Sequence, residues 1–363
     1  MSVLQPSTPR LAAIERARRA VLLHGEPGDC GPIEAWITNS WQRCLQRGQR
    51  AQDAVGFDVV SAAAMRRATD TSRALHAAAA PVLTELSRVI ALTRYFSILT
   101  DSQGIVVAVG GNPDFDLAPV RAIARVGVDL SERSVGTTAI SAALTELHPV
   151  WLHRGEHFFE ATSVYSCAGA PIFGPDGDCA GMLDLTGVQV QERPELRHLA
   201  AQMAQRVEQA LLLAVPHRRL LRLQWPGPSS VAGPALLAVN GESRIAGANR
   251  SACAMLGLRY DAAAAGFGAL EDVFATMAGR LMSLLPGQLP LQVPLWSGLQ
   301  IQVASVHGGS SGVVEPAVRL RDAETDLIRL AVDATRGNVA EAARQLGISR
   351  ATVYRRMKQR PQR

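Results

Sequence analysis

The carboxy-terminal segment, residues 322–363, holds the pattern that most constrains the fold of this chain. Apolar side chains recur there at helical spacing in three short stretches. The stretches are residues 322–335, 339–346 and 350–358. Gly337 ends the first and Asn338 caps the second, while Gly347 supplies a turn in which a positive φ costs least. We therefore expect three short helices joined by tight turns, which is a helix-turn-helix.

The third predicted helix is strongly basic on its outward face. Val353 and Met357 are four residues apart and should point inward, which leaves mainly polar and basic side chains outside. Residues 344–363 contain seven Lys or Arg and no acid, a distribution that attracts phosphate backbones. Ser349 is a good N-cap, and arginine can be bidentate to guanine. The alternatives are a DNA-reading helix and a structural helical hairpin with a solvated basic face.

A known family carries this pattern. The run Asn338-Val-Ala-Glu-Ala-Ala-Arg-Gln-Leu-Gly-Ile-Ser-Arg-Ala-Thr-Val-Tyr-Arg-Arg-Met-Lys358 closely resembles the Fis-type helix-turn-helix that ends many bacterial enhancer-binding regulators. The resemblance implies double-stranded DNA as a partner and a homodimer formed through the first helix of the domain. It also implies that DNA is contacted by the residues that match the family's recognition helix, namely Ser349, Arg350, Thr352, Tyr354, Arg355 and Lys358.

The middle of the chain has a different character. Residues 95–101 and 105–109 read as two strands with a turn between them, and residues 136–147 fit a helix. A second hairpin is expected from residues 167–173 and 179–186, which flank Gly174-Pro-Asp-Gly177. These elements predict an antiparallel sheet with helices, an α+β sensor-like domain.

The whole chain therefore reads as an α+β multidomain protein with a carboxy-terminal all-α domain. Linkers are expected at Trp225-Pro-Gly-Pro-Ser-Ser230 and at His307-Gly-Gly-Ser-Ser-Gly312. The expected parts are an N-terminal helical region (1–90), a sensor domain (91–190), a connector helix (191–224), a small domain with a hairpin, a short helix and two later strands (231–306), and the DNA-binding domain (320–363).

The connector helix has two interpretations. Its predicted span is residues 192–223, and its apolar stripe is Leu196, Leu199, Met203, Val207 and Leu211. Such a stripe packs on the sheet of its own chain, or it forms a dimer with a second copy. We leave both open here.

The front of the chain resembles the acetoin-catabolism-regulator family of sigma-54 activators. The motifs occur in order as Ile37-Thr-Asn-Ser-Trp-Gln-Arg-Cys44, Ser134-Val-Gly-Thr-Thr-Ala-Ile140, Pro149-Val150, Gly155-Glu-His-Phe158, Cys167-Ala-Gly-Ala-Pro-Ile172 and Asp176-Gly-Asp-Cys-Ala-Gly-Met-Leu-Asp-Leu-Thr-Gly187. They cover most of residues 34–215 and imply a GAF domain, a fold that commonly binds a small effector. Residues 236–258, with Asn249 before a short helix, look like the start of a PAS domain.

One departure from that family is large. Its members usually carry an ATP-driven AAA+ domain between sensor and DNA-binding domain, whereas about a hundred residues separate Val215 from Asp322 here. A phosphate-binding P-loop needs a lysine, and the only lysine of the chain, Lys358, lies in the predicted DNA-binding helix. We expect a regulator without ATPase activity that acts by occupancy, by contacting RNA polymerase, or beside a full-length activator.

Composition restricts the remaining classes. No apolar run approaches a membrane span or a signal peptide, so we expect a cytoplasmic protein with no membrane partner. The net charge is a modest +5. Five scattered cysteines lack a CxxC pair, which argues against a disulfide framework and a structural zinc site. A bridge between Cys167 and Cys179 is not expected, because a hairpin would pair Cys179 with a residue near Ile172.

Enzyme readings remain as alternatives. His153 and His157 are four residues apart, but no third metal ligand is evident, so no metal, cofactor or catalytic residue is assigned. Cys167 could serve a GAF-type redox enzyme similar to methionine sulfoxide reductase, although no local positive charge would activate it. An effector-binding adaptor is a further alternative. If an effector binds, the expected pocket residues are Phe158, Tyr165 and Cys167.

Overall fold

The computed structural model describes residues 9–23, 33–227, 234–263 and 266–306, together with Val339, Ala343, Arg350 and Val353. The chain divides into two compact units, Met1–Gly309 and Ser310–Arg363. The first unit contains two five-stranded sheets, which are described in turn. No helix among the described residues is long and apolar enough to cross a membrane.

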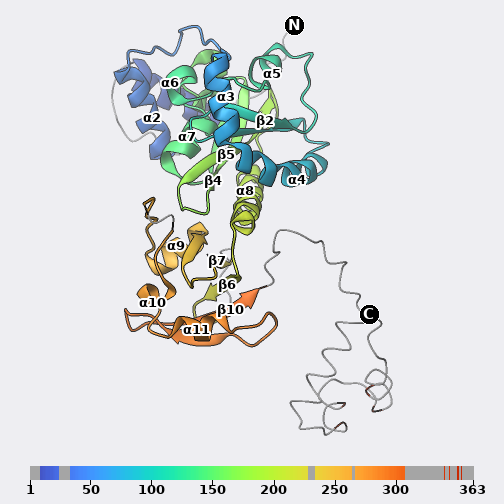
Figure 1. The fold of residues 1–363 in the computed structure, drawn as a ribbon. Helices are drawn as coiled ribbons and strands as arrows, with labels where there is room; N and C mark the ends of the chain where they lie inside the picture. Colours follow the sequence, from blue (N-terminus) through green and yellow to red (C-terminus); the bar gives the residue numbers. More distant parts are fainter. Residues whose placement is uncertain are drawn as a thin grey trace. The chain divides into compact units, whose positions relative to one another are not determined.

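The first sheet is antiparallel throughout and has the strand order β2-β1-β5-β4-β3. Figure 1 labels three of its strands, β2, β5 and β4. Its strands are β1 (Tyr95–Asp101), β2 (Val106–Gly110), β3 (Val150–His153), β4 (Tyr165–Phe173) and β5 (Cys179–Val188). Every residue of β1 and β4 is buried, because helices cover both faces of the sheet. This arrangement confirms the predicted α+β class.

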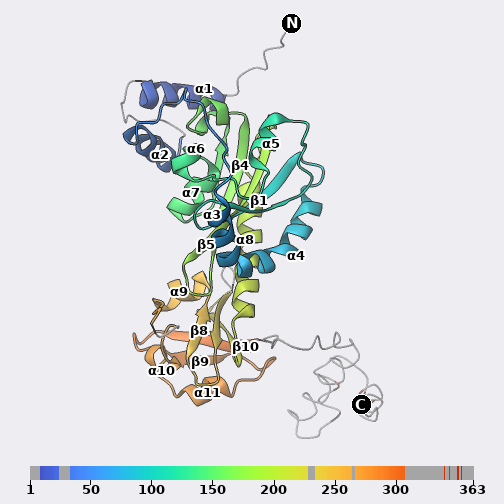
Figure 2. The ribbon, with the colours of Figure 1, turned by 45° about the horizontal axis from the view of Figure 1, so that its top comes forward.

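Two apolar cores form on opposite faces of this sheet. One face carries α1 (Pro9–Arg18), a π-helical turn (Arg19–Leu23), α2 (Ala35–Gln46), α5 (Ala118–Ile123), α6 (Glu132–Val135) and α7 (Ala139–Glu146). The other face carries α4 (Arg73–Val89) and α8 (Leu196–Ala214), as Figure 2 shows. Helix α3 (Ala62–Thr71) precedes α4. The helices before residue 90 therefore share their cores with the sheet.

The β4–β5 hairpin is close to the predicted one, with a shift at its end. Cys167 pairs with Thr186, and Ile172 pairs with Gly181. A bulge between Ile172 and Phe173 then places Cys179 opposite Phe173, one residue from the position expected. The described cysteines, Cys44, Cys167, Cys179 and Cys253, are all free thiols.

The predicted connector helix of residues 192–223 is too long. Helix α8 ends at Ala214, and residues Arg219–Gln224 form strand β6. The physical reason lies in the sequence: Val215 precedes Pro216, and a residue before proline is disfavoured in the helical region. Val215 is accordingly extended, with φ −65° and ψ 132°.

The apolar stripe of α8 packs within its own chain. Leu196, Met203, Val207 and Leu211 are buried in the core that α8 forms with α4 and the sheet, and Leu199 packs against the same core. The stripe therefore covers its own sheet, which is one of the two interpretations that the sequence left open. It does not present these side chains to a second copy.

The second sheet has the strand order β8-β7-β6-β10-β9. Besides β6 its strands are β7 (Ala235–Val239), β8 (Ile245–Ala248), β9 (Leu291–Pro294) and β10 (Gln300–Val306). Helices α9 (Arg250–Leu256), α10 (Leu270–Val273) and α11 (Ala278–Met282) build a core on one face. Asn249 caps α9 by accepting a hydrogen bond from Ala252 N at 3.0 Å, and it also accepts one from Leu236 N at 2.9 Å.

In both sheets a central strand lies between two pairs of strands that are consecutive in sequence. In the first sheet the central strand, β5, is the last in the chain; in the second sheet the central strand, β6, is the first. The strand that follows α8 therefore lies between two hairpins that come later in the sequence.

The two sheets meet through α8 and the β4–β5 turn. Leu212, at the end of α8, is buried with Leu220, Leu236 and Ala238 on the face of the second sheet away from α9–α11. Ala248 N, at the end of β8, donates a hydrogen bond to Pro175 O at 2.8 Å. A side chain at Gly247 would place Cβ 2.9 Å from Leu212 Cδ1, so the Leu212 side chain would have to shift to admit it.

Replacing Met203 by alanine tests the packing of α8. Because Met203 is buried in the core of its own sheet, Met203→Ala should lower the free energy of unfolding by about 2–5 kcal/mol. The exposed residue Gln205 on the same helix provides the control. Gln205→Ala should change the free energy of unfolding by less than about 0.5 kcal/mol. Urea unfolding of both variants measures this. A Met203→Ala protein that is as stable as Gln205→Ala but self-associates less would show that the stripe is a dimer surface.

Candidate functional site

A small cavity lies between β4, β5, α6 and α7 of the first sheet's layer. Its volume is about 30 Å³, and its apolar wall includes Phe57, Ile123, Leu130, Val135 and Ile140. One water needs roughly 10–15 Å³ when cavities are measured in this way, so the space holds about two water-sized groups. The polar part of its wall decides what it can bind.

The structure brings two of the three sequence-predicted pocket residues to this cavity. Tyr165 and Cys167 line it from β4, and the Tyr165 hydroxyl donates to Pro119 O at 3.0 Å. Phe158 is fully buried beside the cavity and packs edge-on against Phe159, with ring centroids 4.9 Å apart. Phe158 therefore lies in the core that supports the pocket and does not line it.

Three side chains on β4 and β5 form a buried hydrogen-bonded chain. The Thr186 hydroxyl donates to Asp184 Oδ2, and Cys167 Sγ lies 3.4 Å from Thr186 Oγ1. Because the hydroxyl proton is directed at the carboxyl group, the thiol must donate to the hydroxyl oxygen. Burial raises the pKa of Cys167 well above its ordinary value, so the thiolate that redox chemistry needs is disfavoured.

Asp184 is fully buried in the middle of β5 and leaves one oxygen unused. Its Oδ1 has no hydrogen-bond partner among the described residues. Burial raises the pKa of Asp184 to about 7, and the hydrogen bonds from Thr186 and from the backbone at Leu185 only partly offset this. A buried polar atom without a partner costs about 1–3 kcal/mol, which makes such an atom a candidate ligand contact.

His157 lines the same cavity and also leaves one polar atom unused. Its Nδ1 lies 2.9 Å from Arg154 O, and since a carbonyl only accepts, Nδ1 carries the proton and donates it. Burial lowers the pKa of His157 to about 4, so the ring is neutral at pH 7. Nε2 is therefore a free hydrogen-bond acceptor without a partner in the described part of the chain.

The sequence reasoning considered His157 only as a metal ligand. His153 ends β3, a 3-10 turn (Arg154–Glu156) follows, and His153 Nδ1 lies 2.8 Å from Ser166 Oγ. The two histidines therefore do not share a helical face. No group of three metal-ligating side chains occurs among the residues described. A lone acid in an apolar strand was the signal that could have identified Asp184.

The segment that carries His157 is held down by α1 and α2. The Arg18 guanidinium donates to Gly155 O at 2.8 Å, to Phe158 O at 3.0 Å and also to His157 O. Trp41 Nε1 donates to Glu156 O at 2.9 Å. These contacts, made by residues more than a hundred positions earlier in the chain, hold the backbone on either side of His157.

The motif Ile37–Cys44 on α2 contributes to a second buried polar group. The Ser40 hydroxyl donates to Glu132 Oε1 at 2.6 Å, Arg43 contacts the same carboxylate at 2.8 Å, and Arg47 contacts it at 2.7 Å. Burial alone would raise the pKa of Glu132, but the hydrogen bonds from these side chains outweigh it and lower the pKa. Glu132 is thus a paired, ionised counterpart to the unpaired Asp184.

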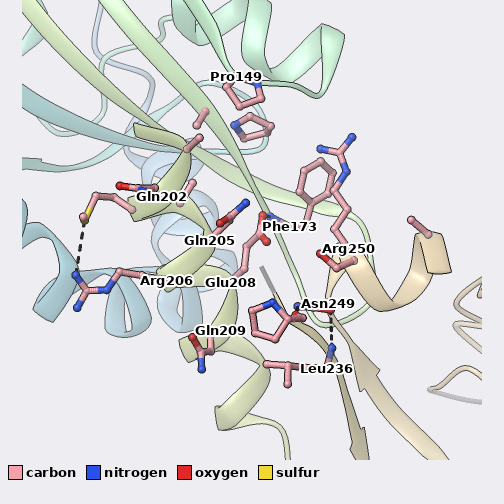
Figure 3. A pocket seen from close by; sticks show the side chains of 18 residues that line it. Pro149, Phe173, Gln202, Gln205, Arg206, Glu208, Gln209, Leu236, Asn249 and Arg250 are labelled. Carbon is pink, nitrogen blue, oxygen red and sulfur yellow. Dashed lines mark hydrogen bonds between the residues drawn. The ribbon is translucent and has the colours of Figure 1, made fainter. Parts of the chain in front are cut away.

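A larger open groove lies between α8 and α9 (Figure 3). Its volume is about 570 Å³. The Arg250 guanidinium stacks 4.2 Å from the centre of the Phe173 ring and donates to Leu147 O at 2.7 Å. Glu208 accepts from Phe173 N at 3.0 Å, and burial raises its pKa to about 7. Phe173, at the end of β4, thus contacts Glu208 of α8 and Arg250 of α9.

The described positions in the second unit fit the predicted helix-turn-helix. Val339, Ala343, Arg350 and Val353 are helical; Ala343 and Val353 are buried and Arg350 is exposed. The other predicted DNA contacts lie outside the described residues; they are Ser349, Thr352, Tyr354, Arg355 and Lys358.

Comparison with known families gives two matches. A model described as the MimR N-terminal domain matches residues 11–209, more than half of the chain. A model described as bacterial regulatory protein, Fis family, matches residues 319–359. The second match coincides with the predicted helix-turn-helix.

Two individual relatives are described as a transcriptional activator and a regulatory protein. The acetoin dehydrogenase operon transcriptional activator AcoR of Bacillus subtilis is 28% identical over 48% of this chain and 29% of its own length. The acetoin catabolism regulatory protein of Cupriavidus necator is 30% identical over 61% of this chain and 34% of its own length. The matches thus span about a third of these relatives. Among solved structures, the Escherichia coli DhaR(N)–DhaL complex matches 76% of this chain and 99% of that chain, with 14% identity and a TM-score of 0.47.

The contrast between Asp184 and Glu132 predicts a pH-dependent difference in stability. Because the folded-state pKa of Asp184 is raised from 3.8 to about 7, the unfolded chain loses this proton first, and ionisation destabilises the fold as pH rises towards 7. Asp184→Asn removes that effect. Its stabilisation relative to the parent protein should be greater at pH 8 than at pH 5 by about 2–3 kcal/mol in urea unfolding.

Glu132→Gln is the matched control. The pKa of Glu132 is lower in the folded state than in the unfolded state, so its ionised form stabilises the fold at every pH above the unfolded-state pKa and this stability is lost only in acid. Glu132→Gln should therefore be less stable than the parent protein at both pH 5 and pH 8. If Asp184→Asn shows the same change in stability at pH 5 and pH 8, the assigned environment of Asp184 is wrong.

Proposed function

Because this chain belongs to the family of the MimR N-terminal domain and carries a Fis-family segment, we propose that it is a bacterial transcription regulator that senses a small effector and binds DNA sequence-specifically. The Fis-family match over residues 319–359 carries the DNA-binding part of this proposal. The exposed Arg350 and the buried Val353 on the helix there support the predicted orientation of the recognition helix.

The effector site in this proposal is the cavity lined by Tyr165 and Cys167 in the GAF-like first sheet. Its unpaired polar atoms support this choice over the groove of Figure 3, whose charged side chains already have partners. A redox enzyme is the second candidate, but the raised pKa of the Cys167 thiol does not favour it.

The signal in this proposal travels along the β4–β5 hairpin. Cys167, Asp184 and Thr186 face the cavity, while the turn of the same hairpin bonds to Ala248 and the end of β4 lies under Arg250. A ligand that alters how the strands sit would therefore act on α9 and the second sheet, which we interpret as PAS-like. For this to work, the ligand must bind two arrangements of the hairpin with different affinities, because equal affinities would leave the equilibrium between them unchanged.

Two further parts of the proposal concern assembly and ATP. We infer a homodimer formed through the predicted helix of residues 322–335, which lies outside the described residues, because paired recognition helices bind DNA more tightly than one. Regulation without ATP follows from the lack of any lysine before Lys358. The remaining modes of regulation are occupancy of the DNA site, contact with RNA polymerase and pairing with a full-length activator. The proposed location of the protein is the cytoplasm.

Arg350→Ala should weaken binding to the operator and relax specificity at one base pair. We expect a cost of about 1–3 kcal/mol if the guanidinium reads a base edge. The operator is first selected from random DNA with the intact protein, and fluorescence anisotropy then gives the affinity. Arg73→Ala, which removes an exposed arginine from the first unit, is the control and should bind normally. Equal operator affinity of the two variants would contradict the assignment of Arg350.

The purified protein should neither bind nor hydrolyse ATP, with or without operator DNA. The reason is that a P-loop needs a lysine beside the phosphates, and Lys358 belongs to the predicted DNA-binding helix. Phosphate release measured in the presence of saturating operator tests this. Operator-dependent ATP turnover that persists in the lysine-free variant Lys358→Ala would refute the proposal outright.

A further inference from the structure

The groove between α8 and α9 contains one acid and one arginine whose charges are not paired with each other. Glu208 of α8 accepts a hydrogen bond from Phe173 N at 3.0 Å, and Arg250 of α9 donates to Leu147 O at 2.7 Å. Both partners are backbone atoms, so neither bond neutralises a charge. Arg250 is near enough to lower the pKa of Glu208, yet the two side chains do not form an ion pair. A space between opposite charges therefore remains for a ligand.

Phe173, at the end of β4, fixes the positions of the two charged groups. Its backbone nitrogen is bonded to Glu208 Oε1, while the guanidinium of Arg250 stacks 4.2 Å from the centre of its ring. Figure 3 shows both side chains beside Phe173 on the wall of the groove. Glu208 Oε2 and the remaining N–H groups of Arg250 bond to no residue that the structure describes. The groove thus presents a free carboxyl oxygen and free guanidinium donors from two different helices.

The rest of the groove wall is mainly uncharged. Among the described residues that line it, the only other charged side chain is Arg206, which pairs with Glu85 at 2.6 Å. Gln202, Gln205 and Gln209 lie along α8, and their amides can both donate and accept hydrogen bonds. Alanine, proline and leucine side chains form much of the remainder. The volume of about 570 Å³ is in the range of roughly 300–1,000 Å³ that is typical of small-molecule sites.

We propose that this groove binds a free α-amino acid with an uncharged polar side chain. The ammonium group donates to Glu208 Oε2, the carboxylate accepts from Arg250, and the side chain lies along the glutamines of α8. An α-amino acid carries both charges on one carbon, which suits two charged groups that are held by one residue. The groove shares no lining residue with the cavity between β4 and β5, so this binding is separate from the effector sensing proposed above.

Charge excludes the simpler ligand classes. A carboxylate without an ammonium group would contact Arg250 but would place a second negative charge near Glu208. An amine without a carboxylate would do the reverse near Arg250. An uncharged molecule would leave both charges unpaired, and a charged side chain would lie among groups without a counter-charge. The class that pairs both groups is a zwitterion with a neutral side chain.

The test uses the full chain and free amino acids at pH 8, where Glu208 is ionised because its pKa is about 7. L-glutamine, L-asparagine and L-serine are the probes. N-acetyl-L-glutamine lacks the ammonium group, and L-glutaminamide lacks the carboxylate. Ligand-observed NMR and the shift in Tm report binding, since a ligand of the folded state raises Tm. We expect L-glutamine to bind, and each blocked derivative to bind at least about tenfold more weakly.

Charge-removing variants then assign the two ends of the ligand. Glu208→Gln and Arg250→Gln should each weaken L-glutamine binding by about tenfold or more, because each removes one charged partner. Glu242→Gln and Arg218→Gln are the matched controls, since both residues are exposed and neither lines the groove. Both controls should bind L-glutamine as the parent protein does.

Ala254→Phe separates occupancy of the groove from the loss of the Arg250 stack on Phe173. It adds a ring to an exposed position of the groove wall and deletes no charged contact, so L-glutamine binding should also fall about tenfold or more. Binding that survives Ala254→Phe would place the amino acid elsewhere. N-acetyl-L-glutamine binding as tightly as L-glutamine would refute the role of Glu208. Failure of all three free amino acids to bind the intact chain would overturn the proposal.

Discussion

The pairing of β4 with β5 is the interaction on which the rest of the first unit depends. The two strands are paired from Tyr165 opposite Val188 to Phe173 opposite Cys179. One face of the pair carries the cavity and α7, and the other carries α8. The turn that joins the strands bonds to β8 through Pro175 and Ala248. A displacement of this hairpin therefore reaches the cavity, the long helix and the second sheet together.

Local patterns in the sequence predicted much of this framework. The Gly174-Pro-Asp-Gly177 turn and the strand-like runs on either side of it identified the β4–β5 hairpin. The error at the end of α8 arose because Leu220, Leu221 and Leu223 extend an apolar stripe, although Pro216 indicates a stop. The one-residue shift of Cys179 comes from a bulge, which alternation alone does not reveal.

The site was only half predictable for a different physical reason. Cys167 stands in a motif of the resemblance and Tyr165 lies two residues before it, whereas the contacts of His157 depend on distant parts of the chain. Arg18 fixes the His157 segment, and these two residues are far apart in sequence. Asp184 becomes unusual only because helices cover both faces of its strand and no cation of the described residues pairs with it, unlike Glu132 with Arg43. Burial and pairing of this kind are tertiary properties.

The central claim is that a ligand in the cavity acts on the second sheet through the β4–β5 hairpin. The most direct measurement is the hydrogen-exchange rate of the Ala248 amide, which donates to Pro175 O at 2.8 Å, with and without a saturating cavity ligand selected from a library of small molecules by ligand-observed NMR. If the hairpin transmits the signal, this rate changes when ligand fills the cavity, while amides of β9, at the far edge of the second sheet, exchange as before. An unchanged rate at Ala248, in a protein whose His157 resonances show that ligand is bound, would contradict the account.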